Sequence, residues 1–282
     1  MDFIKMQGTG NDFVMINALR VERDWPKLAV AMCDRHFGVG ADGIVLVAPS
    51  DAADLKMRMF NPDGSEAEMC GNGIRCFAKY AIEEGLAPGE RAQLTIETLA
   101  GLRTTTARMD GRYVRSVRVG MGKPRLAPKE IPVAASGSGP VIDHAIRVNG
   151  TSFKVTCVSM GNPHAVAFVD EPVSGLPLEV LGPKVEHDKF FPKRVNFEVA
   201  NIVDKRHVTS RVWERGAGLT LACGTGACAV MVAAHLKGLV GDSVEVKVPG
   251  GALNIEWDGK GEVFLEGSAE TVFRGTWPSN GR

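Results

Sequence analysis

The chain has 282 residues, of which 44% are apolar and 23% charged, and its 33 basic and 33 acidic residues give a formal net charge of zero. This composition is typical of a soluble globular protein with one large domain or two smaller ones. The balanced charge argues against nucleic-acid binding, which normally needs a basic excess or stripe. The N-terminus is too polar for a signal peptide, and the most apolar stretch, residues 227–234, is too short to cross a bilayer. We therefore expect a cytoplasmic protein with no membrane or nucleic-acid partner.

Predicted strands and helices alternate along the chain. Proline in the first turn predicts a helix at Pro26–Arg35. Residues 122–140 are rich in Pro, Gly and Ser, which indicates a loop or linker. The predicted strands are Phe3–Gln7, Phe13–Asn17, Gly43–Val47, Leu55–Phe60, Leu94–Thr98, Leu102–Arg108, Tyr113–Val119, Phe153–Ser159, Ala165–Val169, Val195–Val203 and Val208–Trp213, with further short strands between Val244 and Phe273.

An internal repeat indicates that the chain is a duplication. The motif Cys-Gly-x-Gly begins at Cys70 and again at Cys223, an offset of 153 residues, and both copies continue with apolar residues at helical spacing up to a Gly-Leu pair. Asn61 and Glu214 each precede their cysteine by nine residues, and a Gly-Asn pair ending at Asn11 recurs with nearly the same offset. We expect two α+β halves, each with one cysteine at the start of a central helix.

The six cysteines do not resemble a disulfide framework or a zinc site. A cytosolic enzyme of this size rarely carries structural disulfides, and no pair has CxxC spacing. Most buried cysteines act as small hydrophobic residues, and this interpretation fits Cys33, Cys76, Cys157 and Cys228. We expect no metal and no cofactor.

Cys70 and Cys223 fit proton transfer instead. The first turn of a helix has unpaired backbone N–H groups and partial positive charge, which stabilise a thiolate and bind anions. One thiolate can remove an α-hydrogen while the other thiol delivers a proton to the opposite face. Because a helix terminus supplies only about 0.3–1 kcal/mol, a neighbouring polar group should help each thiol, and His164 and Glu214 are the candidates.

A carbanion beside a carboxylate needs amide donors when no metal or pyridoxal is present. The backbone N–H groups that can supply them belong to Gly71, Asn72, Gly224 and Thr225. Arg215 can bind a substrate carboxylate with two hydrogen bonds, and the side-chain amides with suitable positions are those of Asn11, Asn61, Asn162 and Asn196. Taken singly, each asparagine is more often a turn residue, and Glu214–Arg215 a surface pair; their clustering around both motifs favours the functional interpretation.

These motifs resemble the diaminopimelate epimerase family over essentially the whole chain. The matching segments are Phe3–Met6, Gly10–Phe13, Asp34–Gly40, Asn61–Ser65, Met69–Cys76, Gly161–His164, Arg194–Asn196, Glu214–Gly218 and Ala222–Ala229. The resemblance implies a pyridoxal-independent isomerase that converts LL-diaminopimelate to the meso form for lysine and peptidoglycan synthesis. It implies an α+β fold of two pseudo-symmetric domains, residues 1–121 plus 262–282 and residues 122–261, each a mostly antiparallel β-barrel-like sheet around a central helix, with the site in the cleft between them.

The resemblance also assigns roles to residues. Cys70 and Cys223 would be the acid–base pair, supported by His164 and Glu214. The substrate-binding residues would be Asn11, Asn61, Gly71, Asn72, Asn162, Asn196, Glu214, Arg215, Gly224 and Thr225. The substrate is a small amino acid, and the family is commonly a homodimer. Three positions depart from frequent family residues: Gly43 replaces a substrate-binding glutamine, Leu219 a glutamate, and Phe273 a tyrosine at the dimer contact.

Four alternatives remain open on the sequence alone. A related two-cysteine racemase could act on proline or hydroxyproline. Residues 38–43 formally fit the dinucleotide motif GxGxxG, which would indicate an oxidoreductase, although they follow an apparent helix. Cys223 and His164 could form a cysteine hydrolase, which would leave Cys70 unexplained. The last alternative is a binding protein without catalytic activity.

Overall fold

The computed structural model describes residues 1–89 and 92–278 and divides into two compact units. Unit 1 comprises Met1–Gly120 and the residues from Glu266 onward, and unit 2 comprises Met121–Leu265. The domain limits predicted from the sequence, 1–121 plus 262–282 and 122–261, include residues 279–282, which lie outside the described residues. That unit 1, with Cys70, and unit 2, with Cys223, each form one half of a catalytic site stays a prediction.

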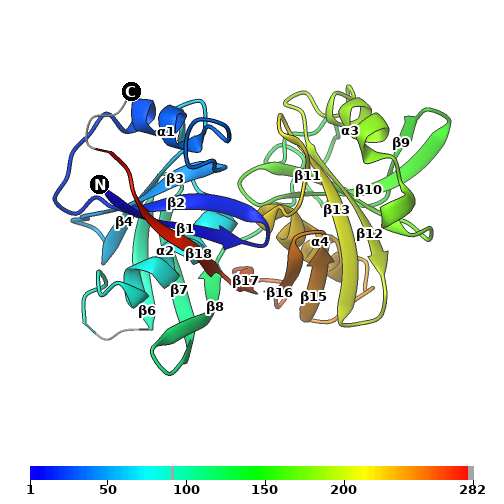
Figure 1. Ribbon diagram of the computed structural model, residues 1–282. Helices are drawn as coiled ribbons and strands as arrows, with labels where there is room; N and C mark the ends of the chain where they lie inside the picture. The colour runs from blue at the N-terminus through cyan, green and yellow to red at the C-terminus, as the bar shows by residue number, and fades with distance from the viewer. Residues whose placement is uncertain (90–91, 279–282) are drawn as a thin grey trace. The chain divides into compact units, whose positions relative to one another are not determined.

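Unit 1 is a sheet with two helices (Figure 1). Its helices are α1 (Trp25–Cys33) and α2 (Gly71–Glu83). Its strands are β1 (Asp2–Gly8), β2 (Asn11–Asn17), β3 (Gly43–Ala48), β4 (Leu55–Phe60), β5 (Glu66–Ala67), β6 (Gln93–Thr98), β7 (Gly101–Asp110), β8 (Tyr113–Gly120) and β18 (Glu270–Thr276). The remaining strand, β17 (Phe264–Gly267), spans the division between the units.

Unit 2 is also built of strands and helices. Its helices are α3 (Leu178–Glu186), α4 (Gly224–Leu236) and the short 3₁₀ turn η1 (Val173–Gly175). Its strands are β9 (His144–Val148), β10 (Thr151–Ser159), β11 (Pro163–Phe168), β12 (Asn196–Ile202), β13 (His207–Glu214), β14 (Gly218–Thr220), β15 (Ser243–Val248) and β16 (Gly251–Glu256).

The two units share one strand-pairing scheme, which is the structural form of the sequence repeat. In unit 1, β1–β2 is antiparallel, β2–β3 parallel, β3–β4 and β4–β5 antiparallel, β4–β6 parallel and β6–β7 antiparallel. In unit 2 the same series runs from β10 through β16. Each parallel pair is joined by a helix-containing crossover, as parallel strands require. The predicted α+β fold of two pseudo-symmetric halves is therefore correct.

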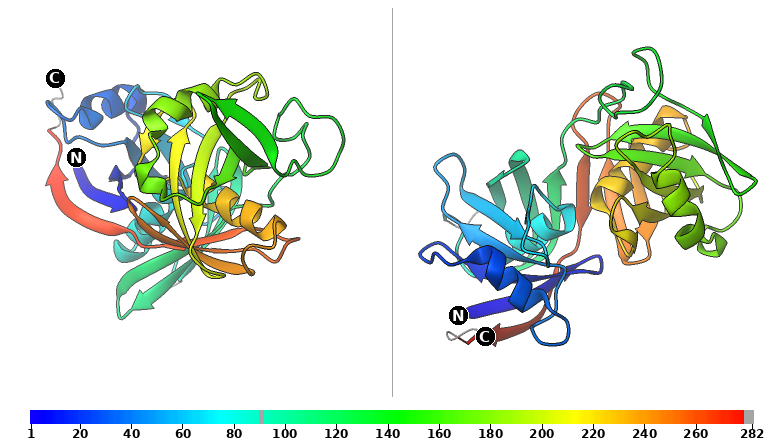
Figure 2. Two further views of the ribbon diagram at one scale, coloured as in Figure 1. Left: turned by 90° about the vertical axis from the view of Figure 1, so that its right-hand side faces the viewer. Right: turned by 90° about the horizontal axis from the view of Figure 1, so that it is seen from above.

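Helices α2 and α4 are the central helices of their units. Helix α2 packs against β1, β2, β3, β7 and β8, and α4 packs against β10, β11, β12, β13, β15 and β16. Figure 2 shows the chain from two further sides. Nearly every residue of α4 is buried and apolar, which is the pattern of a helix enclosed on all sides. Both helices sit inside their sheets, so the cysteine at each N-terminus has a fixed position in its unit.

The Gly-Leu pairs of the repeat end the two central helices in the same way. Gly85 and Gly238 have φ values of 65° and 66°, a conformation that glycine adopts without steric cost. The following leucines, Leu86 and Leu239, donate backbone N–H groups to Ala81 and Ala234. This is the hydrogen-bond pattern of the Schellman motif, so the sequence repeat is a repeated helix stop.

Helix α3 is the main element that the sequence did not predict. Pro183 lies inside it and removes a backbone donor, which normally argues against a helix. Gly182, also unfavourable in a helix, is required here because a Cβ at this position would lie 2.3 Å from Trp213. Close packing on Trp213 thus overrides the local preference of the sequence. Strands β5, β9 and β14 were likewise not predicted. None of the described helices is long and apolar enough to span a membrane.

Candidate active site

Cys70 is the N-cap of α2. Its backbone is extended, with φ −130° and ψ 123°, and its sulfur accepts a hydrogen bond from the backbone N–H of Gly73 at 3.4 Å. Cysteine here takes the role that Ser, Thr, Asp or Asn usually fills at a helix start. A Cβ at Gly73 would lie 3.3 Å from the methyl group of Met57. The thiol of unit 1 therefore sits at a positive helix end, beside a methionine-lined turn.

Cys223 is the N-cap of α4 with nearly the same geometry. Its φ and ψ are −118° and 112°, and its sulfur accepts the N–H of Gly226 at 3.3 Å. The hydroxyl oxygen of Thr225 lies 3.4 Å from the same sulfur. A Cβ at Gly226 would lie only 2.8 Å from a carboxylate oxygen of Glu198. Glycine at this position therefore admits an acidic side chain where unit 1 has methionines.

The surroundings of Cys223 favour its protonated form. Burial, and next the negative charges of Glu214 and Glu198, raise the pKa of the Cys223 thiol well above its usual value, against the opposing hydrogen bonds from Thr225 and Gly226. Burial also raises the pKa of Glu214, whose carboxylate accepts the hydroxyl of Thr220 at 2.5 Å. The structure thus brings the two predicted catalytic residues Cys223 and Glu214 into one environment, which favours the thiol form of Cys223.

His164 is completely buried and both of its ring nitrogens are engaged. Nδ1 lies 2.7 Å from a carboxylate oxygen of Glu198, and Nε2 lies 2.9 Å from the amide oxygen of Asn162. Asn162 in turn donates its amide N–H to the hydroxyl of Thr225 at 3.2 Å. A cysteine hydrolase would need one ring nitrogen directed at Cys223. The ring contacts Glu198 and Asn162 instead, which argues against that alternative.

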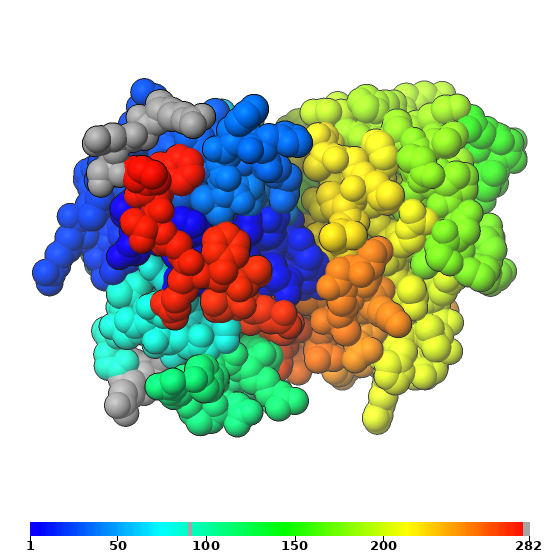
Figure 3. All heavy atoms as spheres, viewed as in Figure 1, coloured from blue at the N-terminus to red at the C-terminus, as the bar shows by residue number. Residues whose placement is uncertain are grey.

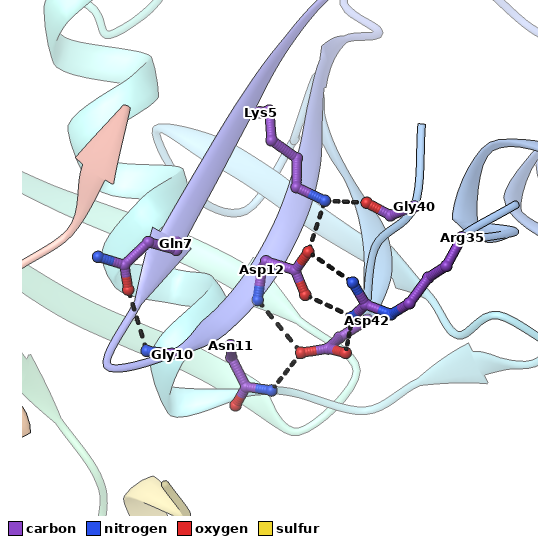
Figure 4. A network of polar contacts seen from close by, with 8 residues as sticks. All are labelled: Lys5, Gln7, Gly10, Asn11, Asp12, Arg35, Gly40 and Asp42. Atoms are coloured by element: carbon purple, nitrogen blue, oxygen red, sulfur yellow. Dashed lines mark hydrogen bonds and ion pairs between the residues drawn. The ribbon is translucent and has the colours of Figure 1, made fainter. Parts of the chain in front are cut away.

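The amides of unit 1 form a second, extended network, of which Figure 4 shows the contact between Asn11 and Asp42. Asn11 donates its side-chain N–H to Asp42 at 2.8 Å, and its amide oxygen accepts the side-chain N–H of Asn72 at 2.6 Å. Asn72 accepts a hydrogen bond from the fully buried guanidinium of Arg75 at 3.0 Å, and Arg75 also binds the carbonyl of Gly71. Arg75 and Asp42 thus fix which way the two amides point.

Charged residues extend this network on the other side of Asp42. Arg35 bridges the carboxylates of Asp42 and Asp12, and Asp12 also pairs with the buried ammonium of Lys5 at 2.6 Å (Figure 4). Burial opposes ionisation of Asp12, but the hydrogen bonds and charges of Arg35 and Lys5 outweigh it and lower its pKa to about 2. Lys5 also donates to the carbonyl of Gly40. The orientation of Asn11 therefore depends on a cluster of ion pairs.

Three predicted binding residues form hydrogen bonds with neighbouring parts of the protein. Asn61 lies in a turn and donates its amide to the hydroxyl of Ser65. Asn196 donates to the carbonyl of Pro163 and accepts the backbone N–H of Arg215 at 2.8 Å. The guanidinium of Arg215 is exposed and donates to the carbonyl of Lys193. Asn196 thus holds the Arg215 loop through its side-chain amide, which contacts the backbone of Pro163 and of Arg215.

Gly43 cannot be replaced by a larger residue in this backbone. A Cβ at this position would lie 2.8 Å from the carbonyl oxygen of Phe60 on the neighbouring strand β4. The glutamine that some family members carry here has no place in unit 1 as it is folded. Its position is also the start of β3, directly after Asp42, whose carboxylate holds Asn11. In this chain Asp42 contacts the side-chain amide of Asn11, and residue 43 contributes only backbone.

Sequence reasoning missed Glu198 and Arg75. Glu198 is an acid inside the buried strand β12, and Arg75 a cation inside the buried helix α2. A charged residue within an apolar run was the available signal in both cases, since such residues are almost never buried without a partner. Their partners His164 and Asn72 became evident only with the strand register and the helix packing.

The dinucleotide alternative is wrong. Residues 38–43 connect helix α1 to strand β3, whereas the phosphate-binding motif connects a strand to the N-terminus of a helix. Within residues 1–89 and 92–278, no three His, Cys, Asp or Glu side chains are grouped so that they could hold a metal ion. The six cysteines, all in the described part of the chain, form no disulfide with one another.

Comparison with known proteins identifies the family. Residues 3–127 and 156–272 match the sequence profile of the family described as diaminopimelate epimerase. The chain belongs to the diaminopimelate epimerase family. The diaminopimelate epimerase of Moorella thermoacetica is 52% identical over 281 residues, which cover 99% of both chains, and that of Pelotomaculum thermopropionicum is 47% identical over 281 residues, again 99% of both. The resemblance inferred from the motifs is therefore confirmed.

A solved structure supports the fold independently of this family. A hydroxyproline epimerase from Agrobacterium vitis, crystallised with trans-4-hydroxy-L-proline, matches 98% of this chain and 90% of its own with a TM-score of 0.69. Its sequence is 16% identical, so the likeness concerns the fold alone. The diaminopimelate epimerase family thus shares its two-unit architecture with a more distant epimerase.

Proposed function

We propose that this protein epimerises LL-2,6-diaminopimelate to the meso form without a cofactor, in lysine and peptidoglycan precursor synthesis. The observation that carries the proposal is the pair of equivalent cysteines, each the N-cap of a central helix and each accepting the N–H three residues on. Both lie within the matched family segments. Two acid–base groups of one kind, on duplicated scaffolds, suit a reaction that inverts a carbon centre.

The reaction is a two-base proton transfer. One cysteine, as thiolate, takes the α-hydrogen of the substrate as a proton, and the other, as thiol, gives its proton to the opposite face of the same carbon. Because the pKa of Cys223 is raised by its burial and by the neighbouring carboxylates, we infer that Cys223 holds the proton in the resting enzyme. Cys70 is then the base, and the states are exchanged after each turnover.

The helix N-termini stabilise the developing charge. As the α-carbon loses its proton, negative charge moves onto the substrate carboxylate, and backbone N–H groups directed at that carboxylate stabilise it. Gly71 and Asn72 begin α2, and Gly224 and Thr225 begin α4. Their N–H groups lie in the turns that also hold the sulfur atoms, so one turn of each helix provides both functions.

The polar side chains around these turns bind the substrate. The contacts of Asn11 with Asp42 and Asn72 use one N–H and one oxygen lone pair of its amide. The second N–H and the second lone pair can bind the substrate. Arg215, on an exposed loop held by Asn196, binds the distal or the reacting carboxylate. The other binding residues are Asn61, Asn162, Asn196 and Glu214, with His164 supporting the catalytic cysteines.

We also propose that the protein is a cytoplasmic homodimer. Catalytic thiols stay reduced in the cytoplasm, where glutathione and thioredoxin act. Strand β18 lies on the surface of unit 1 (Figure 3) and exposes Val272 and Phe273, with 56% and 45% of their surface accessible. Phe273 also makes an edge-to-face contact with Phe3, at 6.0 Å between ring centroids. This apolar surface is the proposed subunit contact.

The decisive experiment incubates the purified protein with LL-diaminopimelate in deuterated water, without added cofactor. We expect meso-diaminopimelate with deuterium at the inverted carbon. L-Proline and trans-4-hydroxy-L-proline serve as comparison substrates for the alternative racemase, and we expect no inversion of either. Inversion of proline but not of diaminopimelate would overturn the proposed substrate, and hydrogen exchange of neither would overturn the proposed enzyme class.

A further inference from the structure

The duplicated fold allows the two units to be compared position by position. Phe13 and His164 each stand two residues after the repeated asparagine, Asn11 and Asn162. Phe13 pairs with the first residue of β3, and His164 with the first residue of β12, in parallel register. Two residues further along those strands stand Val45 and Glu198. The buried pair His164–Glu198 of unit 2 therefore occupies the places of Phe13 and Val45 in unit 1.

The fold does not need an ion pair at these places. Phe13 and Val45 are both completely buried, so the scaffold accommodates two apolar side chains there. His164 and Glu198 are equally buried, with side chains 0% and 1% exposed. Replacing a buried ion pair by apolar residues is often neutral or stabilising, because the charges lose their hydration. The pair in unit 2 is therefore better explained by function than by stability.

The two carboxylate oxygens of Glu198 differ in their contacts. Its Oε1 faces His164, whereas Oε2 has no hydrogen-bond partner within the part of the chain that the structure describes. A buried unsatisfied carboxylate oxygen is unusual in folded proteins and costs stability. A residue retained for packing alone would not be expected to carry this cost.

From Glu198 a continuous series of contacts leads to the catalytic sulfur. Glu198 contacts Nδ1 of His164 at 2.7 Å, and Nε2 contacts the amide oxygen of Asn162 at 2.9 Å. The amide N–H of Asn162 donates to Thr225 at 3.2 Å, and the Thr225 hydroxyl lies 3.4 Å from the sulfur of Cys223. With Asn162 donating to its oxygen, the Thr225 hydroxyl can direct its own hydrogen to the sulfur. Both ring nitrogens of His164 face oxygen atoms, so each is placed to donate a hydrogen bond.

We propose that Glu198 is a positioning residue for the epimerisation: its carboxylate holds the ring of His164, and through that ring sets the amide of Asn162 and the hydroxyl of Thr225 beside Cys223. The assignment rests on the proposed function of this site. Nothing in it requires Glu198 to touch the substrate. It predicts that the charge and hydrogen-bonding capacity of residue 198 affect the rate of the chemical step more than substrate binding.

The test compares five proteins: wild type, E198Q, E198V, H164F and the double variant H164F/E198V, which installs the residues of unit 1. We expect kcat with LL-diaminopimelate to fall by at least about tenfold in E198V and less in E198Q, with KM changed by less than about threefold. We expect H164F/E198V to be no less active than H164F, because both changes interrupt one series of contacts. Its thermal midpoint should equal or exceed that of E198V.

Two further measurements separate positioning from packing. Nitrogen-15 spectra of labelled histidine, with His164 assigned by its loss in H164F, should show two protonated ring nitrogens in the wild type and at least one non-protonated nitrogen in E198V at pH 8. The control is E186Q. The carboxylate of Glu186 is buried in the same unit and binds Trp213 and Gly216, and it does not belong to the series of contacts from Glu198 to Cys223. We expect E186Q to keep kcat within about twofold of the wild type.

The proposal is overturned if E198V keeps kcat within about twofold of the wild type, if the His164 signals do not change in E198V, or if E198V lowers the thermal midpoint and H164F/E198V lowers it further. Failure of the proposed function has a different signature. In that case the wild type itself does not invert LL-diaminopimelate, while the nitrogen-15 spectra still report whether Glu198 holds His164.

Discussion

Cys70 and Cys223 occupy the same position in two copies of one fold, but the charged groups buried near them differ in sign. In unit 1 the second turn of the central helix carries Arg75, fully buried. In unit 2 the corresponding residue is Cys228, and the acids Glu198 and Glu214 lie near the sulfur instead. A buried cation favours a thiolate, and buried carboxylates favour a thiol.

This difference shows how a duplicated scaffold can produce two thiols in opposite states. Proton transfer across a carbon needs one base and one acid, so two identical surroundings would be unproductive. The backbone gives both sulfurs the same helix N-terminus and the same N–H donor three residues on. A few buried side chains give the two sulfurs neighbouring charges of opposite sign.

Removing either sulfur should have the largest effect. We expect C70A and C223A to lower epimerisation of both LL- and meso-diaminopimelate by about a thousandfold or more, since each sulfur serves one face of the carbon. The measurement is turnover from both isomers. C157A is the matched control, because burial raises the pKa of Cys157 to about 12 and its thiol stays protonated. A near-normal rate in either C70A or C223A would show that one cysteine serves both faces.

Arg75 and Cys228 allow a test at equivalent positions of the two central helices. R75M leaves the carbonyl of Gly71 and the amide oxygen of Asn72 without the guanidinium that binds them. We expect a loss of about 3 kcal/mol in the free energy of unfolding, or about 6–12 °C in thermal midpoint. C228A removes one sulfur atom and should cost about 1 kcal/mol. Equal losses in the two variants would mean that the Arg75 contacts are not special to unit 1.

The carboxylate of Glu214 should suppress the reactivity of Cys223. E214Q removes a negative charge near the buried thiol of Cys223. That charge is the second-largest cause of the raised pKa of Cys223, after burial. We expect the pKa of Cys223 to fall and its alkylation by iodoacetamide at pH 8 to become roughly tenfold faster. Peptide mass spectrometry of time-quenched samples measures this rate. The reference is E186Q, which changes a buried carboxylate that binds Trp213 and Gly216. A rate for E214Q no faster than for E186Q would contradict the electrostatic account.

Much of the fold follows from the sequence because its signals are local. The Cys-Gly-x-Gly turns and the Gly-Leu stops delimit α2 and α4, and alternating apolar residues locate most strands. Helix α3 escaped prediction because Gly182 and Pro183 both argue against a helix, and only the packing of Gly182 on Trp213 explains it. That contact joins residues 31 positions apart, which no local pattern encodes.

The sequence predicted those residues of the candidate site that lie in or beside short motifs. Cys70, Cys223, His164 and the asparagines stand in or beside recognisable short segments. Glu198 and Arg75 do not, because their roles depend on partners in other elements. Glu198 meets His164 only through the parallel pairing of β11 with β12, and Arg75 meets Thr9 and Ser268 through the packing of α2. Strand register and helix packing are tertiary information, so these residues appear only with the structure.

The ionic cluster around Asp12 provides the smallest and most local test of the comparison, because unit 2 has Pro163 at the equivalent position. The Asp12 pKa is lowered from 3.8 to about 2 in the folded protein. A carboxyl group with a lowered pKa stabilises the fold above its unfolded pKa, and this contribution is lost as the pH falls from about 4 to about 2. Since Arg35 is largely exposed, solvent screening limits the contribution to about 1 kcal/mol.

D12N should therefore be less stable than the wild type by about 1 kcal/mol at pH 7, and the difference should disappear near pH 2. Urea unfolding at pH 7, 4, 3 and 2 measures it, and 0.5 M salt at pH 7 should reduce it because the Asp12–Arg35 pair is partly exposed. P163A, at the equivalent place in unit 2, removes no charge, so its effect should not vary over this pH range. A D12N deficit that persists at pH 2 would place the role of Asp12 in hydrogen bonding, and the ionic difference between the two hairpins would then contribute nothing to stability.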